Sequence, residues 1–146
     1  MEQLLVLTIQ HIAESMPCLS LVDEDYGQLE TQEDTYPVTF PCVLVGNIDT
    51  DWEERTGASQ RGHSSLTVRL AIDCYDDTYA TSGTVEKIAE RQSIAHNMFK
   101  LLNHYKPLPS MSQLIRVKSR SYSINGGIKI YEQTYTFRQS EEEEQQ

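Results

Sequence analysis

The feature that most constrains the fold is the run SLTVRLAIDCY at residues 65–75, in which apolar and mostly polar positions alternate. This period of two is typical of a strand with one face against a core. The apolar positions are Leu66, Val68, Leu70, Ile72 and Cys74. A strand with so many apolar residues is expected near the centre of a sheet, and it requires a second layer to cover its apolar face.

Residues 85–105 have the periodicity of a helix that supplies this layer. One stripe consists of Val85, Ile88, Gln92, Ala95, Phe99 and Leu102, and Ile94, Met98, Leu101 and Tyr105 widen it. Thr84 or Ser82 is the expected N-cap. The predicted core is Leu66, Val68, Leu70, Ile72, Ile88, Ala95, Phe99 and Leu102.

The remaining segments predict a helix and further strands. Residues 2–16 carry a single apolar stripe that Pro17 ends, and residues 18–36 are irregular with one short strand. Residues 37–45 alternate but contain two prolines, so they form an edge strand or a strand that begins at Pro41. Residues 113–124 and 128–137 flank an Asn-Gly-Gly turn and predict a hairpin.

These elements predict an α+β fold with a single, mostly antiparallel sheet. An N-terminal helix and one long helix pack on a face, and an extended β-hairpin forms an arm. Residues 1–138 are expected to form one domain, with residues 46–65 as an extended loop or arm. The acidic residues 139–146 are expected to be disordered.

The arm, GNIDTDWEERTGASQRGHSS, contains many charged residues but no complete metal motif. Asp49 and Asp51 begin like a calcium loop, yet Glu54 occupies the glycine position and Gln60 the twelfth position. Trp52 either anchors a contact with a partner or folds back on its own sheet. A polar connection of this length indicates a contact arm that becomes ordered against a partner.

Arg116, Lys118 and Arg120 alternate along the first strand of the C-terminal hairpin. They predict a basic stripe on one face, which either contacts an acidic surface or is solvated. Both faces of the hairpin carry apolar or aromatic residues, which suggests that a second copy of the chain covers part of the sheet.

The charge is unevenly distributed along the sequence. The net charge is −10, but residues 1–60 hold twelve acidic residues and one basic residue, whereas residues 61–138 hold eleven basic and six acidic residues. The overall acidity argues against a nucleic-acid-binding protein. The two parts offer complementary surfaces within one molecule or between copies.

Catalytic and metal-binding signatures are missing from the sequence. The three cysteines and four histidines have no zinc spacing, and there is no nucleophile elbow, phosphate loop or dinucleotide fingerprint. Asp73, Asp76 and Asp77 suggest a metal nuclease, but the matching lysine pattern does not follow. We therefore expect no enzyme, no cofactor and no metal. No apolar run spans a membrane, and Glu2 stands where a secretion signal carries positive charge, so an intracellular protein is expected.

The layout resembles the tail terminator (tail-to-head joining, tail completion) proteins of bacteriophages and prophages. The resemblance lies in the N-terminal helix, TFPCVLVGNIDTDWEERTG, LTVRLAIDCYDD, the helix VEKIAERQSIAHNMFKLL and the strand pair INGGIKIYEQTYTFR, and it covers residues 1–138. The acidic residues 23–34 and the glutamate tail have no counterpart in it. It implies a ring of six copies that terminates the tail tube and joins the tail to the head.

The implied partners are the chain itself, the tail tube protein and a head connector or neck protein, with no membrane and no sequence-specific nucleic acid, although DNA would pass through the ring. The implied location is the virion, after assembly in the host cytoplasm. The expected interface residues are Trp52, Glu53, Glu54, Arg55, Arg116, Lys118 and Arg120. Three alternatives stay open: a head-completion or neck connector, a small metal-dependent nuclease, and a monomeric adaptor that binds through the strand edge at 37–45.

Overall fold

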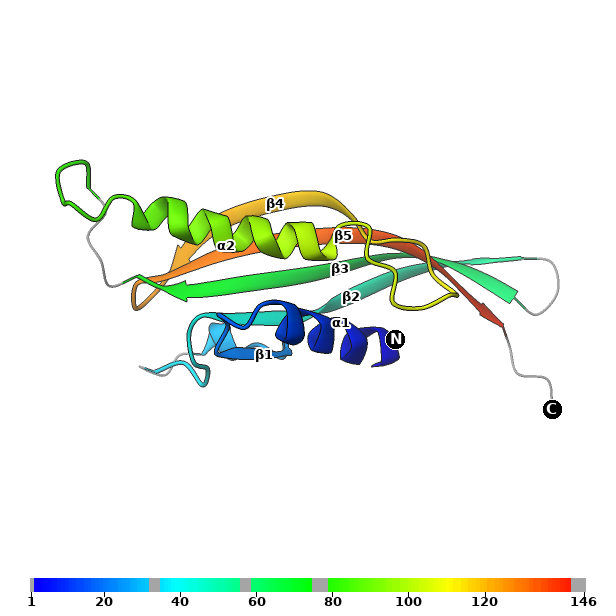
Figure 1. Cartoon of the computed structure of the whole chain (residues 1–146). Helices are drawn as coiled ribbons and strands as arrows, with labels where there is room; N and C mark the ends of the chain where they lie inside the picture. The colour runs from blue at the N-terminus through cyan, green and yellow to red at the C-terminus, as the bar shows by residue number, and fades with distance from the viewer. Residues whose placement is uncertain (1, 32–34, 56–58, 75–78, 143–146) are drawn as a thin grey trace.

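The sheet has five strands in the order β1-β2-β3-β5-β4 (Figure 1). The structure, a computed structural model, describes residues 2–31, 35–55, 59–74 and 79–142. The strands are β1 (Leu21–Glu24), β2 (Cys42–Glu54), β3 (Ser59–Asp73), β4 (Ile115–Ile124) and β5 (Ile128–Glu142). Among the described strands, only the β1–β2 pair is parallel, and β3 lies at the centre of the sheet. The predicted α+β fold with a single, mostly antiparallel sheet is confirmed.

Helices α1 (Glu2–Ser15) and α2 (Lys87–Leu102) pack on one side of the sheet, which we call the helix face (Figure 1). The core on this face includes Leu4, Ile12 and Met16 of α1, Val43, Val45, Leu66, Val68, Leu70 and Ile72 of the central strands, Ala95, Met98 and Leu102 of α2, and Tyr135 and Phe137 of β5. No helix in the described parts of the chain is long and apolar enough to cross a membrane.

The buried stripe of α2 is rotated relative to the predicted one. Ala95 and Leu102 are buried as expected, but Met98 is fully buried, whereas Phe99 is half-buried and Ile88 is 36% exposed. The helix also begins at Lys87 rather than directly after Thr84. The Ser82 hydroxyl accepts a hydrogen bond from the Thr84 backbone N–H in a local turn instead of capping the helix.

The side of the sheet away from the helices, which we call the opposite face, has its own apolar cluster. It contains the buried residues Leu29, Cys42, Leu44, Ala71, Ile128 and Ile130, with Tyr36, Val38 and Phe40 packed against them. The segment between β1 and β2, which includes the short 3-10 helix η1 (Gln28–Glu30), therefore contributes the cover for this end of the sheet. Ile128 and Ile130 of the C-terminal hairpin are thus covered within one molecule, whereas Ile115 and Val117 are exposed. Cover of part of the sheet by a second copy stays a prediction.

Strand β2 is not an edge strand at its start. It begins at Cys42, directly after the cis Phe40–Pro41 bond, and Cys42–Val45 pair with β1. The reading of residues 37–45 as an edge strand was wrong, and the alternative start at Pro41 is correct to one residue. The adaptor hypothesis loses its binding edge here. The residue after β1 also covers this edge closely, because a Cβ on Gly46 of β2 would lie only 2.6 Å from Asp25 Cβ.

The arm is a paired ribbon rather than a loop. β2 and β3 pair from Asp49 opposite Ser65 to Glu54 opposite Gln60, so only residues 55–58 connect the strands. β5 pairs with β3 as far as Glu142, so residues 139–142 belong to a strand and not to a disordered tail. Residues 143–146 lie outside the described parts. The predicted hairpin turn is present, with φ of 88° at Gly126 and 73° at Gly127.

Candidate assembly interface

Three strands extend beyond the ends of both helices and form the arm (Figure 1). They are the C-terminal half of β2, the N-terminal half of β3 and the C-terminal end of β5. Thr50 and Ser64 share a hydrogen bond of 2.8 Å between their hydroxyl oxygens, and Gln139 Nε2 donates to Ser64 Oγ at 3.0 Å. These polar side chains join the three strands on the helix face of the arm.

Trp52 lies on the helix face of the arm, opposite Gly62 of β3. A Cβ at Gly62 would lie 3.0 Å from Trp52 Cζ3, so the indole ring rests on this glycine. The side chain is nevertheless 40% exposed. The ring therefore packs on its own sheet and still presents apolar surface to solvent. Its role as the anchor of a contact with a partner stays a prediction.

On the opposite face of the arm, β2 presents an acidic row, and Arg61 of β3 and Arg138 of β5 lie on the same face. Asp49, Asp51 and Glu53 stand at alternate positions of β2, and His63 Nε2 lies 3.7 Å from Glu53 Oε2. An open groove of about 570 Å³ runs beside them, with Ile115 of β4 among its lining residues. Among the described residues, no group of three or more His, Cys, Asp or Glu side chains is arranged to hold a metal ion.

The three basic residues of β4 do not share one face. The register against β5 shifts between Arg116, which lies opposite Tyr135, and Lys118, which lies opposite Thr134. A β-bulge at Val117 reverses the alternation. Arg116 therefore lies on the helix face, with its Cζ 3.7 Å from the centre of the Phe99 ring. The predicted single stripe was wrong, because a bulge has no signature in the alternation of residue types.

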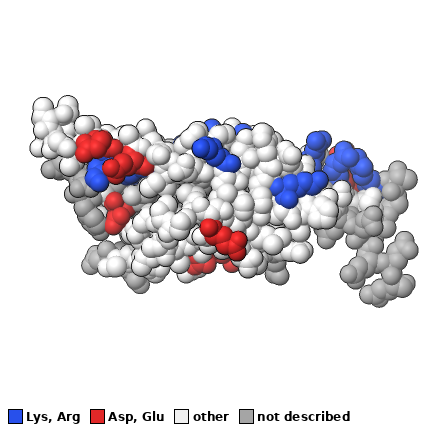
Figure 2. Space-filling model, viewed as in Figure 1, with Lys and Arg blue, Asp and Glu red and all other residues white. Residues whose placement is uncertain are grey.

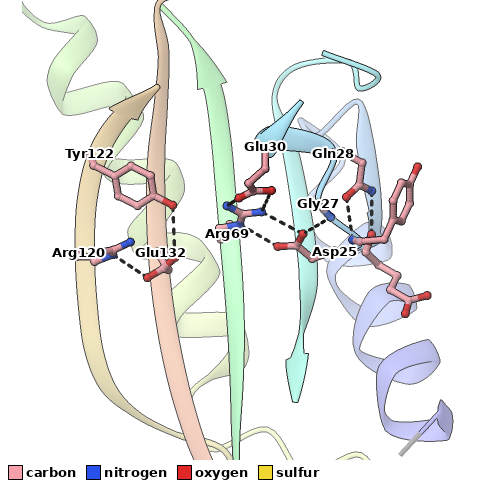
Figure 3. Close-up of polar contacts among 10 residues, drawn as sticks. Asp25, Gly27, Gln28, Glu30, Arg69, Arg120, Tyr122 and Glu132 are labelled. Atoms are coloured by element: carbon pink, nitrogen blue, oxygen red, sulfur yellow. Dashed lines mark hydrogen bonds and ion pairs between the residues drawn. The ribbon is translucent and has the colours of Figure 1, made fainter. Parts of the chain in front are cut away.

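Lys118 and Arg120 lie on the opposite face, where Arg120 Nε donates to Glu132 Oε2 at 2.8 Å (Figure 3). The Arg120 guanidinium also lies over the Tyr122 ring, with its Cζ 4.6 Å from the ring centre. Lys118 and Val117 are exposed, Val117 to 59%. β4 is the outer strand on this side of the sheet.

An ion-pair cluster around Arg69 anchors the segment after β1 to the opposite face (Figure 3). The Arg69 side chain donates from Nε to Asp25 Oδ2 at 2.8 Å and from Nη2 to Asp25 Oδ1 at 3.0 Å. Nη1 and Nη2 donate to the Glu30 carboxylate. Burial alone lowers the pKa of Arg69, but hydrogen bonds to Glu30 and Asp25 outweigh it and raise the pKa.

This cluster was not predicted from the sequence. Its signal is an arginine within the apolar run 65–75, preceded by the acidic residues 23–34, which the family resemblance left unexplained. The cluster is structural in character, because its charges are paired with each other and Arg69 and Asp25 are almost completely covered.

The surface charges do not divide simply into an acidic and a basic half. On the helix side, Figure 2 shows basic side chains gathered toward the arm end, and acidic side chains gathered at the other end and along the lower edge. The acidic row of the arm lies on the face turned away from that view. The charges on the opposite face of the arm are divided by strand, with acidic residues on β2 and the basic residues Arg61 and Arg138 on β3 and β5.

The predicted interface residues thus occupy two separate places. Trp52, Glu53, Glu54 and Arg55 lie together at the tip of the arm. The basic residues lie on β4, which is separated from β2 by β3 and β5. The structure therefore does not bring the two groups together within one molecule.

Comparison with protein-family models and with curated protein sequences finds no match. Among solved structures, the fold is similar to that of a chain in the structure entitled "Virion of native gene transfer agent (GTA) particle". The TM-score is 0.60, the alignment covers 96% of both chains, and the identity is 10%. At this identity the likeness establishes a shared fold over nearly the whole length.

Proposed function

We propose that the protein is a structural component of a virion, and that copies of it form a ring at the end of a tail tube. The observation that carries this proposal is the fold shared with a chain of a gene transfer agent virion over 96% of both chains. A ring of this kind terminates tail polymerisation and joins the tail to the head. Its mechanism is assembly, in which unlike surfaces on neighbouring copies fit each other.

The arm and β4 supply such unlike surfaces. The arm presents Trp52 and an acidic row, whereas β4 presents Lys118 and Arg120 together with exposed apolar residues. Glu53, Glu54 and Arg55 follow Trp52 at the tip of the arm, and we propose that they contribute to the same contact. Arg116 lies on the helix face, where its guanidinium contacts the Phe99 ring and holds β4 against α2. We propose six copies, by analogy with the family that the sequence resembles.

The first test is the location of the protein in particles. We would tag the C-terminus, purify particles from an induced culture of the strain of origin, and label the tag with gold for electron microscopy. Label at the head-proximal end of tails supports the proposal. Particles that contain no tagged protein, or label distributed along the tube, would contradict it.

Deletion of the gene separates a terminator from a neck connector. Loss of a terminator removes the stop on tube growth, so overlong tails are expected. Loss of a connector instead leaves tails of normal length that are detached from filled heads. Overlong tails support the proposed role, and detached tails of normal length would assign the protein to the neck.

A further inference from the structure

The sheet has two unpaired edges that differ in charge and lie on opposite sides of the molecule. In the described residues, β1 pairs with β2 only as far as Val45, so the outer edge of β2 along the arm has no neighbouring strand. The outer edge of β4 is also without a neighbouring strand in the described parts, although Asn103 Oδ1 accepts the Arg116 backbone N–H. Edges that expose apolar residues are prone to pair with another strand.

We propose that the arm of one copy pairs with β4 of the next copy, so that the sheets of neighbouring copies join into one continuous sheet. This inference rests on the proposed ring and names the surfaces that form it. The pairing uses residues 49–52 of β2 and residues 117–120 of β4. It is heterologous, because two different edges meet, and repeated heterologous contacts close into a ring.

Strand direction favours antiparallel pairing. β2 is antiparallel to β3, β3 to β5, and β5 to β4, so β4 runs opposite to β2 within one copy. If neighbouring copies are related by rotation about an axis along the strands, the arm of the next copy also runs opposite to β4. The joined sheet would then be antiparallel throughout its larger strands.

One register satisfies both faces of the joined sheet. It places Asp51 opposite Lys118 and Asp49 opposite Arg120, and all four side chains belong to the opposite face. Residues directly opposite each other in neighbouring strands share a face, and unlike charges there are stabilising. The bulge at Val117 is what places Lys118 and Arg120 on the same face as the acidic row.

The same register brings the exposed apolar residues together. Trp52, 40% exposed, comes opposite Val117, 59% exposed, and burial of both surfaces favours association. A shift of two residues keeps two charge pairs but places Glu54 opposite Val117. The apolar pair therefore distinguishes the proposed register from its nearest alternative.

The resulting stagger is compatible with closure. Within one copy, Lys118 is aligned through Thr134 and Thr67 with Gly46 of β2. The next copy meets Lys118 at Asp51, which lies opposite His63, so the position along β3 advances by four residues, from Thr67 to His63, for every four strands. With about 3.3 Å per residue and about 4.8 Å between strands, this stagger corresponds to a strand tilt of about 35°, at the lower end of the range of closed barrels. The tilt does not depend on the number of copies.

Disulfide formation tests the register directly. In a Cys18→Ser/Cys74→Ser background, which removes the exposed and the half-buried native cysteines, we would combine Thr50→Cys with Ser119→Cys, which the register places opposite each other. Opposite Cα atoms in antiparallel strands are about 4.5–5.5 Å apart, within the range of disulfides. The native Cys42 is fully buried, and burial raises the pKa of its thiol to about 11, so it does not compete.

A matched control combines Thr50→Cys with Ser123→Cys, which lies four residues, or about 13 Å, further along β4. Mild oxidation should produce a ladder of cross-linked multimers only for the Thr50/Ser119 pair. Each single-cysteine variant should remain uncross-linked. Dimers formed by Ser119→Cys alone would show that two β4 edges pair with each other and would overturn the proposal.

Native mass spectrometry of the same samples distinguishes a failure of the strand pairing from a failure of the proposed function. Rings without a ladder for the Thr50/Ser119 pair would overturn the strand pairing and leave the proposed function intact. If purified tail particles contain no ring of this chain and no ladder, the proposed function fails and the strand pairing with it. A ladder that ends at the size of the ring supports both.

An exchange of charges gives a second, independent test. Asp51→Lys and Lys118→Asp each place like charges opposite each other, and each should raise the concentration needed for half-assembly about tenfold. Both residues are exposed, so the fold should be retained. The double variant should restore assembly. Additive loss in the double variant would show that the two side chains do not meet.

Discussion

At the scale of single residues, Arg69 is the strongest constraint on how the chain covers the opposite face. Its carboxylate partner Asp25 has a side chain that is only 4% exposed. Removal of one member of a buried ion pair leaves an uncompensated buried charge, which costs more than the pair itself contributes. The cluster thus fixes where the segment after β1 crosses the sheet.

We predict that Arg69→Leu lowers the free energy of unfolding by about 3–5 kcal/mol, because the Asp25 carboxylate loses its counter-charge. Urea unfolding followed by circular dichroism measures this change. The matched control is Arg120→Leu, which removes an arginine that is 56% exposed from its pair with Glu132 and should have a smaller effect. Equal losses in the two variants would contradict the special role of Arg69. Addition of Asp25→Asn to Arg69→Leu should recover part of the loss.

The side chains of α2 offer a second comparison at this scale. Met98 is fully buried, whereas Phe99 is half-buried under the Arg116 guanidinium. Met98→Ala should therefore cost about 2–5 kcal/mol. Phe99→Ala should cost less than the roughly 3–5 kcal/mol of a fully buried phenylalanine. Both values come from the same unfolding experiment, and a larger loss for Phe99→Ala would show that the helix is rotated differently.

At the scale of elements, the described residues of the segment 50–61, at the tip of the arm, contribute nothing to either apolar cluster of the sheet. On the helix face of β3, the first buried apolar residue after the arm is Leu66. Deletion of residues 50–61 removes the tip and the pairing partners of the last residues of β5. It leaves the helices and both clusters in place.

We predict that this deletion lowers the melting temperature by only about 4 °C, which corresponds to about 1 kcal/mol, while it impairs attachment to tails. Trp52→Ala should reproduce much of the attachment loss, since aromatic anchors commonly carry about 2 kcal/mol or more of a contact. Tyr79→Ala is the matched control, because Tyr79 is an exposed aromatic residue that precedes α2, outside the arm. An unfolded deletion variant would assign the arm to the core. Normal tails without residues 50–61 would show that the arm makes no essential contact.

The elements themselves could largely be predicted from the sequence, because their apolar residues recur with the periods of helices and strands. The run at 65–75 identified the central strand, and Asn125-Gly126-Gly127 identified a turn that needs positive φ angles. The arm was different. Its strands are polar on both faces, so alternation of apolar residues gave no signal, and a paired ribbon was taken for a loop.

The site was less predictable than the fold, because it depends on contacts between distant segments. The bulge at Val117 is set by how β4 fits against β5, and no local residue pattern encodes it. The pairing of Arg69 with Asp25 joins residues that are 44 positions apart. The composition indicated that acidic and basic residues were both present, but only the register of the strands shows which of these residues share a face.

At the scale of the whole molecule, the two unlike edges give the protein a direction. The acidic arm lies on the β2 side of the sheet and the basic β4 strand on the other side. Copies that associate through these edges must all point the same way around a ring. A two-fold symmetric dimer would instead place like edges together, where their like charges would oppose association.

This arrangement predicts how assembly depends on ionic strength. The charged pairs proposed between copies lie at exposed positions, so salt should screen them, and the screening length falls from about 10 Å at 0.1 M to about 3 Å at 1 M. Ring formation, measured by sedimentation at several salt concentrations, should therefore weaken as salt rises. Lys118→Gln should assemble less well at low salt and should respond less to added salt, because one screened interaction is already absent. If wild type and Lys118→Gln have the same salt dependence, Lys118 is not at the contact. If neither protein responds to salt, apolar contacts such as that proposed between Trp52 and Val117 hold the ring instead.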